Sequence, residues 1–146
     1  MSIERYLPHS GVMVLLDEII SYDNKHITTS LCVCKDNAFL NEYGEFELFN
    51  TLELMAQSVG ILRGLSNEKE SNKLGFLLST RGFKIYKNAV KIGANLRIKT
   101  TMSMQDESGF GLYECEVYEN QNIVASANIS LLNPSEEILV KIKGDE

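Results

Sequence analysis

Hydrophobic and polar residues alternate along most of this chain, and a period of two is typical of half-buried β-strands. Residues 12–22 and 26–35 form the first two stretches of this kind, with Asp23 and Asn24 as turn residues between them. Residues 36–47 look irregular. Further apolar stretches, most of them alternating, follow at 74–79, 83–86, 94–104, 111–119 and 122–132. The polar segments 108–111 and 119–122 separate the last three and predict hairpin turns.

One segment has a helical period instead. Between residues 49 and 65, apolar side chains recur every three to four positions and also fill the flanks of that stripe. A helix that is apolar almost all round is buried in a globular protein. Either Asn50 or Thr51 is suited to cap its start. Small residues fall four apart on one stripe, where the backbone can approach a sheet closely, at Ala56, Gly60 and Gly64.

The order of these elements is strand, strand, one long helix, and then a run of antiparallel strands. This order predicts an α+β protein of the hotdog architecture, in which a curved antiparallel sheet wraps around one long central helix. Prolines occur only at Pro8 and Pro134, and no linker or repeat interrupts the chain. We therefore expect a single domain over residues 1–146. By analogy with this fold, we also expect it to pair into a dimer with a continuous sheet.

Composition narrows the possible functions. Asp and Glu number 20 and Lys and Arg 14, a net charge of −6 that disfavours binding to nucleic acid. No apolar run reaches the ~20 residues of a membrane span, and no secretion signal begins the chain, so we expect a cytoplasmic protein. The three cysteines lack a CxxC spacing, and His9 and His26 are the only histidines. We therefore expect reduced, buried thiols and no metal site.

Positive charge is concentrated in one part of the chain. Residues 71–105 contain no Asp or Glu but seven of the fourteen basic residues. A cationic flank on an acidic protein suits a negatively charged partner, such as an acidic carrier protein with a phosphopantetheine arm. We expect Lys84, Lys87 and Lys91 to dock such a carrier. The alternative is a basic face that is simply solvated.

Two residues stand out as proton carriers. Glu53 lies in the first turn of the apolar helix, with Gln57 one turn further on the same face. A buried carboxyl there would gain a partner or a raised pKa and could act as a general acid or base. The alternative is a surface carboxylate that complements the helix dipole. His9 follows Pro8 in an unusual turn, and the alternative for it is a solvated loop histidine.

Several segments together carry a family resemblance. Residues 7–19, LPHSGVMVLLDEI, and 52–57, LELMAQ, resemble the 3-hydroxyacyl-acyl-carrier-protein dehydratases of the hotdog superfamily, the FabZ and FabA type. The ApeP-like branch, which belongs to aryl polyene biosynthesis, is more similar still. Its likeness extends to residues 74–78 (LGFLL), 104–107 (MQDE) and 110–115 (FGLYEC), so that the resemblance covers nearly the whole chain.

The resemblance implies roles for individual residues. Glu53 matches the acidic residue of the family's helix and is implied as the catalytic carboxyl, and Gln57 matches the glutamine that supports it. In the main dehydratase branch a histidine precedes this acid in a His-Phe-Pro-Gly segment, but residues 36–43 here contain none. Asn37 can hold a substrate by hydrogen bonds but cannot take a proton at neutral pH. Either His9 supplies the base, or the chain is impaired as a dehydratase.

The leading hypothesis is therefore dehydration of a 3-hydroxyacyl thioester to a trans-2-enoyl thioester in fatty-acid or aryl-polyene biosynthesis. His9 would be the base and Glu53 the acid, and an amide at the helix start would hold the thioester oxygen. The acyl chain would lie in an apolar tunnel beside the helix, at a dimer interface. Substrate-binding positions would be Gln57, Asn37, Asn50 and Gly60.

This chemistry needs no metal or redox cofactor, because the substrate arrives on the phosphopantetheine of acyl carrier protein or CoA. We expect a homodimer, with a heterodimer as the other possibility. Two alternative functions remain open. One is a hotdog acyl thioesterase in which Glu53 activates water. The other is a non-catalytic hotdog subunit that partners an active dehydratase, which the missing histidine favours.

Overall fold

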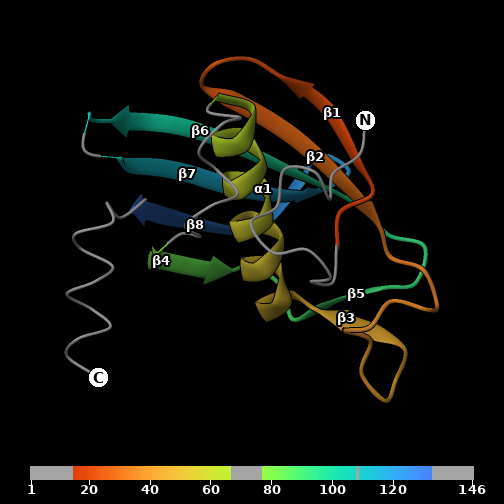
Figure 1. The fold of residues 1–146 in the computed structure, drawn as a ribbon. Coiled ribbons are helices and arrows are strands. Elements are labelled where there is room, and N and C mark those ends of the chain that lie inside the picture. Colours follow the sequence, from red (N-terminus) through yellow and green to blue (C-terminus); the bar gives the residue numbers. More distant parts are fainter. Residues whose placement is uncertain (1–14, 67–76, 108, 133–146) are drawn as a thin grey trace, which may run out of the picture.

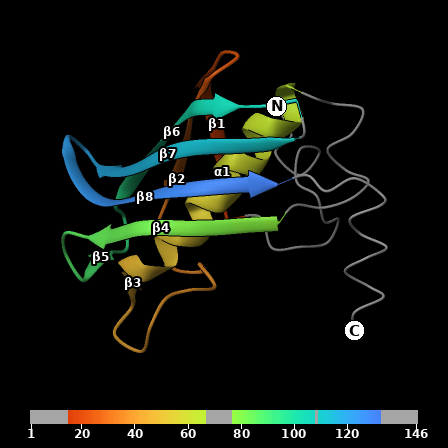
Figure 2. The same cartoon turned by 90° about the vertical axis from the view of Figure 1, so that its left-hand side faces the viewer.

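The computed structural model describes residues 15–66, 77–107 and 109–132. Its elements are β1 (Glu18–Tyr22), β2 (His26–Cys32), β3 (Glu45–Glu47), the 3-10 turn η2 (Leu48–Asn50), α1 (Thr51–Ser66), β4 (Leu77–Ile85), β5 (Ala89–Lys91), β6 (Asn95–Gln105), β7 (Phe110–Glu119) and β8 (Asn122–Leu132). Six strands form an antiparallel sheet in the order β1-β2-β6-β7-β8-β4, and β3 pairs with β5 separately. Helix α1 crosses one face of the larger sheet (Figures 1 and 2).

Alternation along the strands places this sheet on the helix. In β6, the side chains of Leu96, Ile98 and Thr100 are buried, whereas those of Arg97 and Lys99 are exposed. Successive strand residues point to opposite faces, so the buried set packs beneath α1 and the charged set faces outward. The predicted α+β layering, with one helix against a curved antiparallel sheet, is confirmed.

Helix α1 is buried along nearly its whole length. Glu53 is the one exposed residue between Thr51 and Leu65. In the middle of the helix, the hydroxyls of Ser58 and Thr29 on β2 form a buried hydrogen bond of 2.8 Å, which fixes the helix against the sheet. At the helix start, the Thr51 hydroxyl donates to the carbonyl of Leu48 in η2. The predicted buried helix is therefore confirmed, with an additional 3-10 turn before it.

The structure differs from the predicted strands in three places. In the described part of the first predicted strand, regular pairing begins only at Glu18, although Leu15 and Leu16 are already buried. Two short strands, β3 and β5, lie where none was predicted, because three residues are too few for a clear alternation. The described residues of the stretches 74–79 and 83–86 belong, up to Ile85, to one strand, β4, whose register shifts between Arg81 and Lys84.

Candidate functional site

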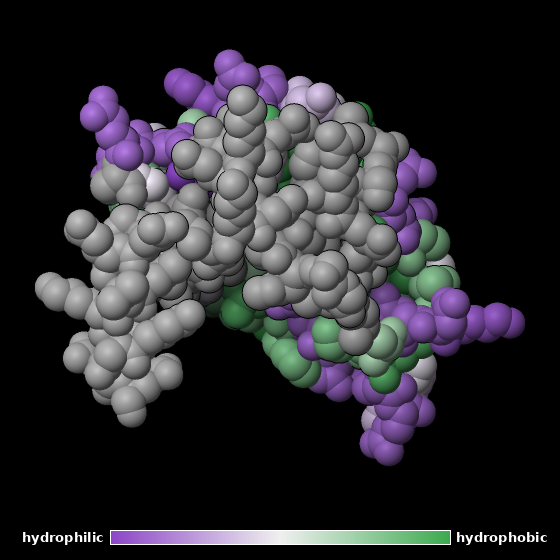
Figure 3. All heavy atoms as spheres, viewed as in Figure 1, coloured by the Kyte–Doolittle hydropathy of each residue, from purple (hydrophilic) through white to green (hydrophobic). Residues whose placement is uncertain are grey.

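The start of α1 and the end of β4 lie together at one edge of the molecule. The backbone N–H of Leu48 donates to the carbonyl of Asn88, in the turn that follows β4, at 2.9 Å. Hydrophobic side chains reach the surface where these segments meet (Figure 3). Phe49 is 56% exposed, Tyr86 53% and Ile85 41%. Exposed apolar groups next to a sheet edge are typical of a surface that another chain covers.

Glu53 lies in the first turn of α1, four residues after Phe49. Its side chain is exposed in the single chain, so the predicted burial of this carboxyl is wrong for the isolated protomer. The reason is its angular position, because at 100° per residue it faces away from Ser58 and the sheet. The carboxylate also lies in the first turn, where it complements the helix dipole.

Gln57 follows Glu53 on the same face of α1 but is 94% shielded, with 6% of its surface exposed. Its side-chain carbonyl Oε1 accepts a hydrogen bond of 3.1 Å from the backbone N–H of Leu15. This glutamine therefore fixes the chain just before β1 against the helix. Of the other predicted substrate-binding residues, Gly60 in α1 is buried and Asn50 in η2 is half-buried.

Residues 36–43, which lack the histidine of the main dehydratase branch, form turns through hydrogen bonds to their own asparagine side chains. The Asn37 Oδ1 atom accepts from the backbone N–H of Phe39 at 2.8 Å. The Asn41 Oδ1 atom accepts from Tyr43 and Glu45, at 2.9 and 3.0 Å. Both asparagines thus use their side-chain carbonyls to form turns. His9 lies outside the described residues.

An unusual thiol contact begins this segment. The Cys34 thiol donates to the Asp36 carboxylate, with 2.8 Å between sulfur and oxygen. This hydrogen bond raises the pKa of Cys34 and lowers the pKa of Asp36. Cys34 is therefore held as a neutral thiol, which makes it a weak nucleophile. Cys32 and Cys34 are both exposed, so the predicted burial of the thiols is wrong for these two and right only for Cys115.

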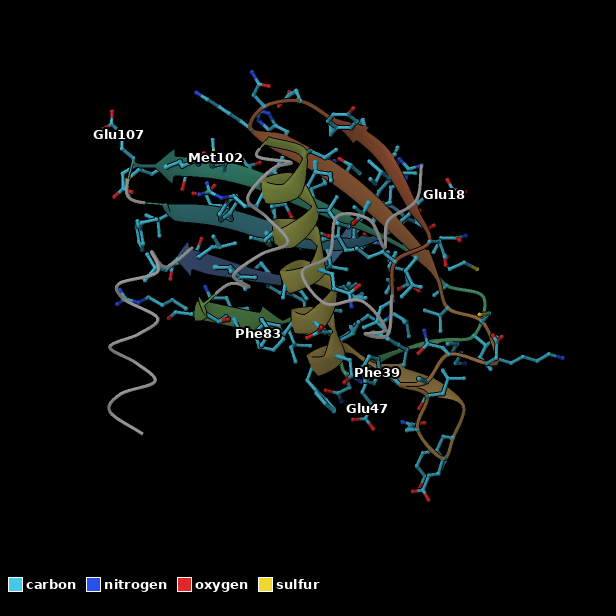
Figure 4. All side chains as sticks on the ribbon, in the orientation of Figure 1. Glu18, Phe39, Glu47, Phe83, Met102 and Glu107 are labelled. Carbon is cyan, nitrogen blue, oxygen red and sulfur yellow. The ribbon has the colours of Figure 1, made fainter. Side chains whose placement is uncertain are left out.

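Strand β4 is an edge of the six-stranded sheet. It pairs with β8 on one side, and no described strand pairs with its other side. Figure 4 shows Phe83 projecting from β4 beside the first half of α1, where it packs partly buried against the core. An open edge presents unpaired N–H and C=O groups that another strand can satisfy. The start of α1 therefore lies near a strand edge that no described strand pairs.

The predicted cationic flank is divided by the fold. Strands β7 and β8 separate β4 from β6, and β7 carries the exposed acids Glu114 and Glu116 between them. Arg97 and Lys99 therefore do not join the basic residues of β4, and the prediction of one continuous flank is wrong. The Lys99 ammonium instead lies 5.0 Å from the centre of the Tyr118 ring.

The three predicted docking lysines are all exposed, and they come from β4, β5 and the turn between these strands. Lys87 forms an ion pair of 2.8 Å with Glu119 on β7. Within the described residues, neither Lys84 nor Lys91 has an ion-pair partner, so these two retain their full charge toward solvent.

Two open grooves are formed by described residues elsewhere on the surface, and Glu53 is not among the residues that line them. The larger, of about 760 Å³, runs over β1, β2, β6 and the end of β7, and its lining includes Asp17, Arg97 and Lys99. Within residues 15–66, 77–107 and 109–132, no three His, Cys, Asp or Glu side chains gather closely enough to hold a metal ion. In that same part of the chain, no helix has the length and hydropathy needed to span a membrane.

One charged residue that sequence reasoning missed lies in the core. Arg63, in the last turn of α1, is only 3% exposed. Its signal was present, since it is the single basic residue in a helix predicted to be apolar almost all round. It lies beside Tyr113 of β7, whose pKa is raised by burial while the nearby guanidinium partly opposes that rise.

Comparisons with known proteins agree with this architecture. A family model described as "ApeP-like: ApeP dehydratase" matches residues 1–141. The 3-hydroxyacyl-[acyl-carrier-protein] dehydratase FabZ of Chlamydia muridarum is 29% identical over 140 residues, which cover 89% of this chain and 88% of that protein.

Solved structures give the same result. A chain of the dehydratase heterocomplex ApeI:P from Xenorhabdus doucetiae superposes with a TM-score of 0.85 and 26% identity, covering 97% of both chains. The E. coli PaaI protein of the phenylacetic acid degradation operon, at 16% identity, covers 79% of this chain and 81% of its own, with a TM-score of 0.62. The latter likeness concerns the fold alone. Together these matches confirm the predicted hotdog fold.

Proposed function

Because the chain belongs to the ApeP-like dehydratase family, we propose that it takes part in dehydrating a 3-hydroxyacyl thioester to a trans-2-enoyl thioester. The substrate would be carried on the phosphopantetheine of acyl carrier protein or on CoA. We propose further that the chain works as one subunit of a hotdog pair. The observation that carries the proposal is the edge of β4, which no described strand pairs and whose end lies close to the start of α1, where Glu53 is exposed.

The reaction explains why a second subunit is needed. A base removes the proton from the α-carbon, the C–O bond at the 3-position breaks, and an acid protonates the departing hydroxyl, which leaves as water. In the proposal Glu53 is the acid, and His9 or a group of the second subunit is the base. A strand paired to β4 would cover the carboxyl and exclude water, which strengthens every polar interaction in the site.

Features of the chain and its relatives support this pairing. Phe49, Ile85 and Tyr86 give the edge an apolar surface that a second hotdog subunit would bury. The Xenorhabdus relative was solved as a heterocomplex of two dehydratase subunits, and we propose a comparable heterodimer here, with a homodimer as the alternative. Lys84 and Lys91 would attract an acidic carrier protein to the same side.

A second candidate function is a non-catalytic subunit that supports an active partner. It is favoured by residues 36–43, which hold no histidine and whose two asparagines use their carbonyl oxygens in their own turns. In that case Glu53 would stabilise the helix start alone, and all of the chemistry would reside in the partner.

The test is an assay of enoyl absorbance from 3-hydroxyacyl carrier protein. It would compare the chain alone with the chain co-purified with a second hotdog dehydratase subunit of its own organism. We expect turnover only in the pair, and we expect Glu53→Gln in this chain to lower the rate by about 100-fold or more. Glu114→Gln is the matched control, because Glu114 is exposed on the outer face of β7.

The outcomes separate the candidates. If Glu53→Gln leaves the rate of the pair within about threefold of the unmodified rate, Glu53 is not the acid and the non-catalytic subunit is correct. If the chain alone releases free thiol from acyl-CoA, the hotdog thioesterase is the better description. If the two proteins do not co-purify and the chain alone dehydrates the substrate, the pairing with a different subunit is refuted.

A further inference from the structure

The edge strand β4 carries charge of one sign only. Arg81 and Lys84 are both exposed, and the whole strand contains no Asp or Glu. Their partners on the neighbouring strand β8 are Asn128 and Ser126. Asn128 is exposed on the face of β8 that lies opposite its buried residues. Since directly paired residues point to the same side of a sheet, both cations project from the face that turns away from α1.

Neither cation is neutralised within the sheet. The cross-strand rows of Arg81 and Lys84 continue across β8 to Glu114 and Glu116 on β7. Two strand spacings, about 10 Å, separate each cation from the acid in its row. This distance is about one Debye length at 0.1 M salt, so the acids of β7 neutralise the edge only weakly. Among the described residues, neither Arg81 nor Lys84 forms an ion pair.

A second copy of the chain is poorly suited to this edge. Strand β4 spans Leu77–Ile85, with Arg81 at its centre. A symmetric antiparallel pairing of two whole strands therefore places the two-fold axis at Arg81, and this residue opposite its own copy. Moving the axis toward Lys84 brings Arg81 opposite Lys84 instead. Like charges directly opposite each other are about 5 Å apart and destabilise the pair.

The same edge is well suited to a strand of different composition. Ile85 and the following Tyr86 are exposed, and Phe83 is only partly buried against the core, so an added strand would cover apolar surface. An acid on the outer face of that strand would lie about 5 Å from Arg81 or Lys84. That is half the distance to the acids of β7, and the attraction would be correspondingly stronger.

We propose that β4 binds the edge strand of a different hotdog subunit, one that carries Asp or Glu on its outer face, and that Arg81 and Lys84 oppose pairing between identical copies. This inference rests on the proposed function, in which the chain is one subunit of a pair, and deepens it by naming the chemistry of the partner. Lys91, on β5, lies outside these two rows and stays available to an acidic carrier protein.

The experiment measures association of the full chain without substrate, by sedimentation with one protein fluorescently labelled. Arg81→Glu/Lys84→Glu reverses both charges, and this variant is mixed with the unmodified chain. We expect the mixed dimer to be at least tenfold tighter than either protein with itself, and to weaken as salt is raised. Arg97→Glu/Lys99→Glu is the matched control, because it makes the same change of charge on the outer face of β6, away from the edge.

Two further measurements extend the test. Arg81→Gln/Lys84→Gln removes the repulsion without adding attraction, and it should dimerise with itself at least tenfold more tightly than the unmodified chain. Arg81→Glu/Lys84→Glu should bind the second hotdog dehydratase subunit of the same organism at least tenfold more weakly, whereas the β6 control should bind it as the unmodified chain does. Circular dichroism of each variant checks that it is folded.

Each outcome has one meaning. A mixed dimer no tighter than the self-pairs, a β6 control that forms an equally tight mixed dimer, or an unmodified chain that dimerises as tightly as Arg81→Gln/Lys84→Gln would overturn the inference. A pair that assembles as expected but does not dehydrate the substrate would refute the proposed function and leave the inference standing. Turnover by a pair whose affinity ignores the charge reversal would refute the inference alone.

Discussion

The two ends of helix α1 carry opposite charges in opposite surroundings. At the first turn, the Glu53 carboxylate is exposed, four residues after the exposed Phe49. At the last turn, the Arg63 guanidinium is buried against β7 with two unpartnered N–H groups. Each charge has the sign that the helix dipole favours at its end. The dipole alone therefore cannot explain why one is exposed and the other buried.

The difference indicates which end of the helix is suited to a second subunit. An exposed carboxylate is well solvated, so Glu53 costs the single chain little free energy before a second subunit binds. A buried cation with unpaired donors is costly at all times, so the Arg63 end requires compensation from the surrounding core. The first end has the character of an interface, and the second has the character of a closed core.

The sharpest way to test this contrast is to truncate one leucine at each end. Leu62 is 1% exposed beside Arg63, whereas Leu52 beside Glu53 is only partly buried. We expect Leu62→Ala to lower the free energy of unfolding by about 2–5 kcal/mol and Leu52→Ala by about 1 kcal/mol. Urea denaturation of the single chain measures both. Equal losses of unfolding free energy would contradict the inference that the Arg63 end of the helix is well packed and the Glu53 end is open.

A second test concerns the close contact behind Arg63. We expect Gly111→Ala to cost about 1–3 kcal/mol, because its Cβ would collide with the rigid Tyr113 ring rather than with a flexible side-chain end. Adding Tyr113→Phe removes the contact with Oη and should recover part of this loss. Denaturant unfolding of the single and double variants measures the loss and its recovery. If Gly111→Ala left the free energy of unfolding unchanged, the Tyr113 ring would be free to move away from the new Cβ.

The smallest expected effect is on stability at Glu53. Removing this exposed charge by Glu53→Gln should cost only about 0.5 kcal/mol, the value of a first-turn carboxylate in the helix dipole. Screening by salt should reduce even that difference. The same substitution is expected to lower turnover of the assembled pair by orders of magnitude. A stability loss above about 2 kcal/mol would show that Glu53 has a structural partner instead.

Much of the fold was predictable because its signals are local. The strands β6, β7 and β8 and their two hairpins follow from strict alternation, and α1 follows from its helical period. The short strands β3 and β5 were not predictable, since three residues carry almost no period. The site was predictable only in part. Its acid and glutamine could be identified, but the exposure of one and the burial of the other could not.

The sequence by itself determined which residues alternate, where the single helix lies, and that an acid begins it, because these depend on neighbours along the chain. Only the tertiary structure decided that no described strand pairs with the outer side of β4, that β7 and β8 divide the basic residues, and that Arg63 is buried near Tyr113 of β7. Each of these depends on which strands pair with each other. Strand order brings distant segments together and is not encoded in any local pattern of the sequence.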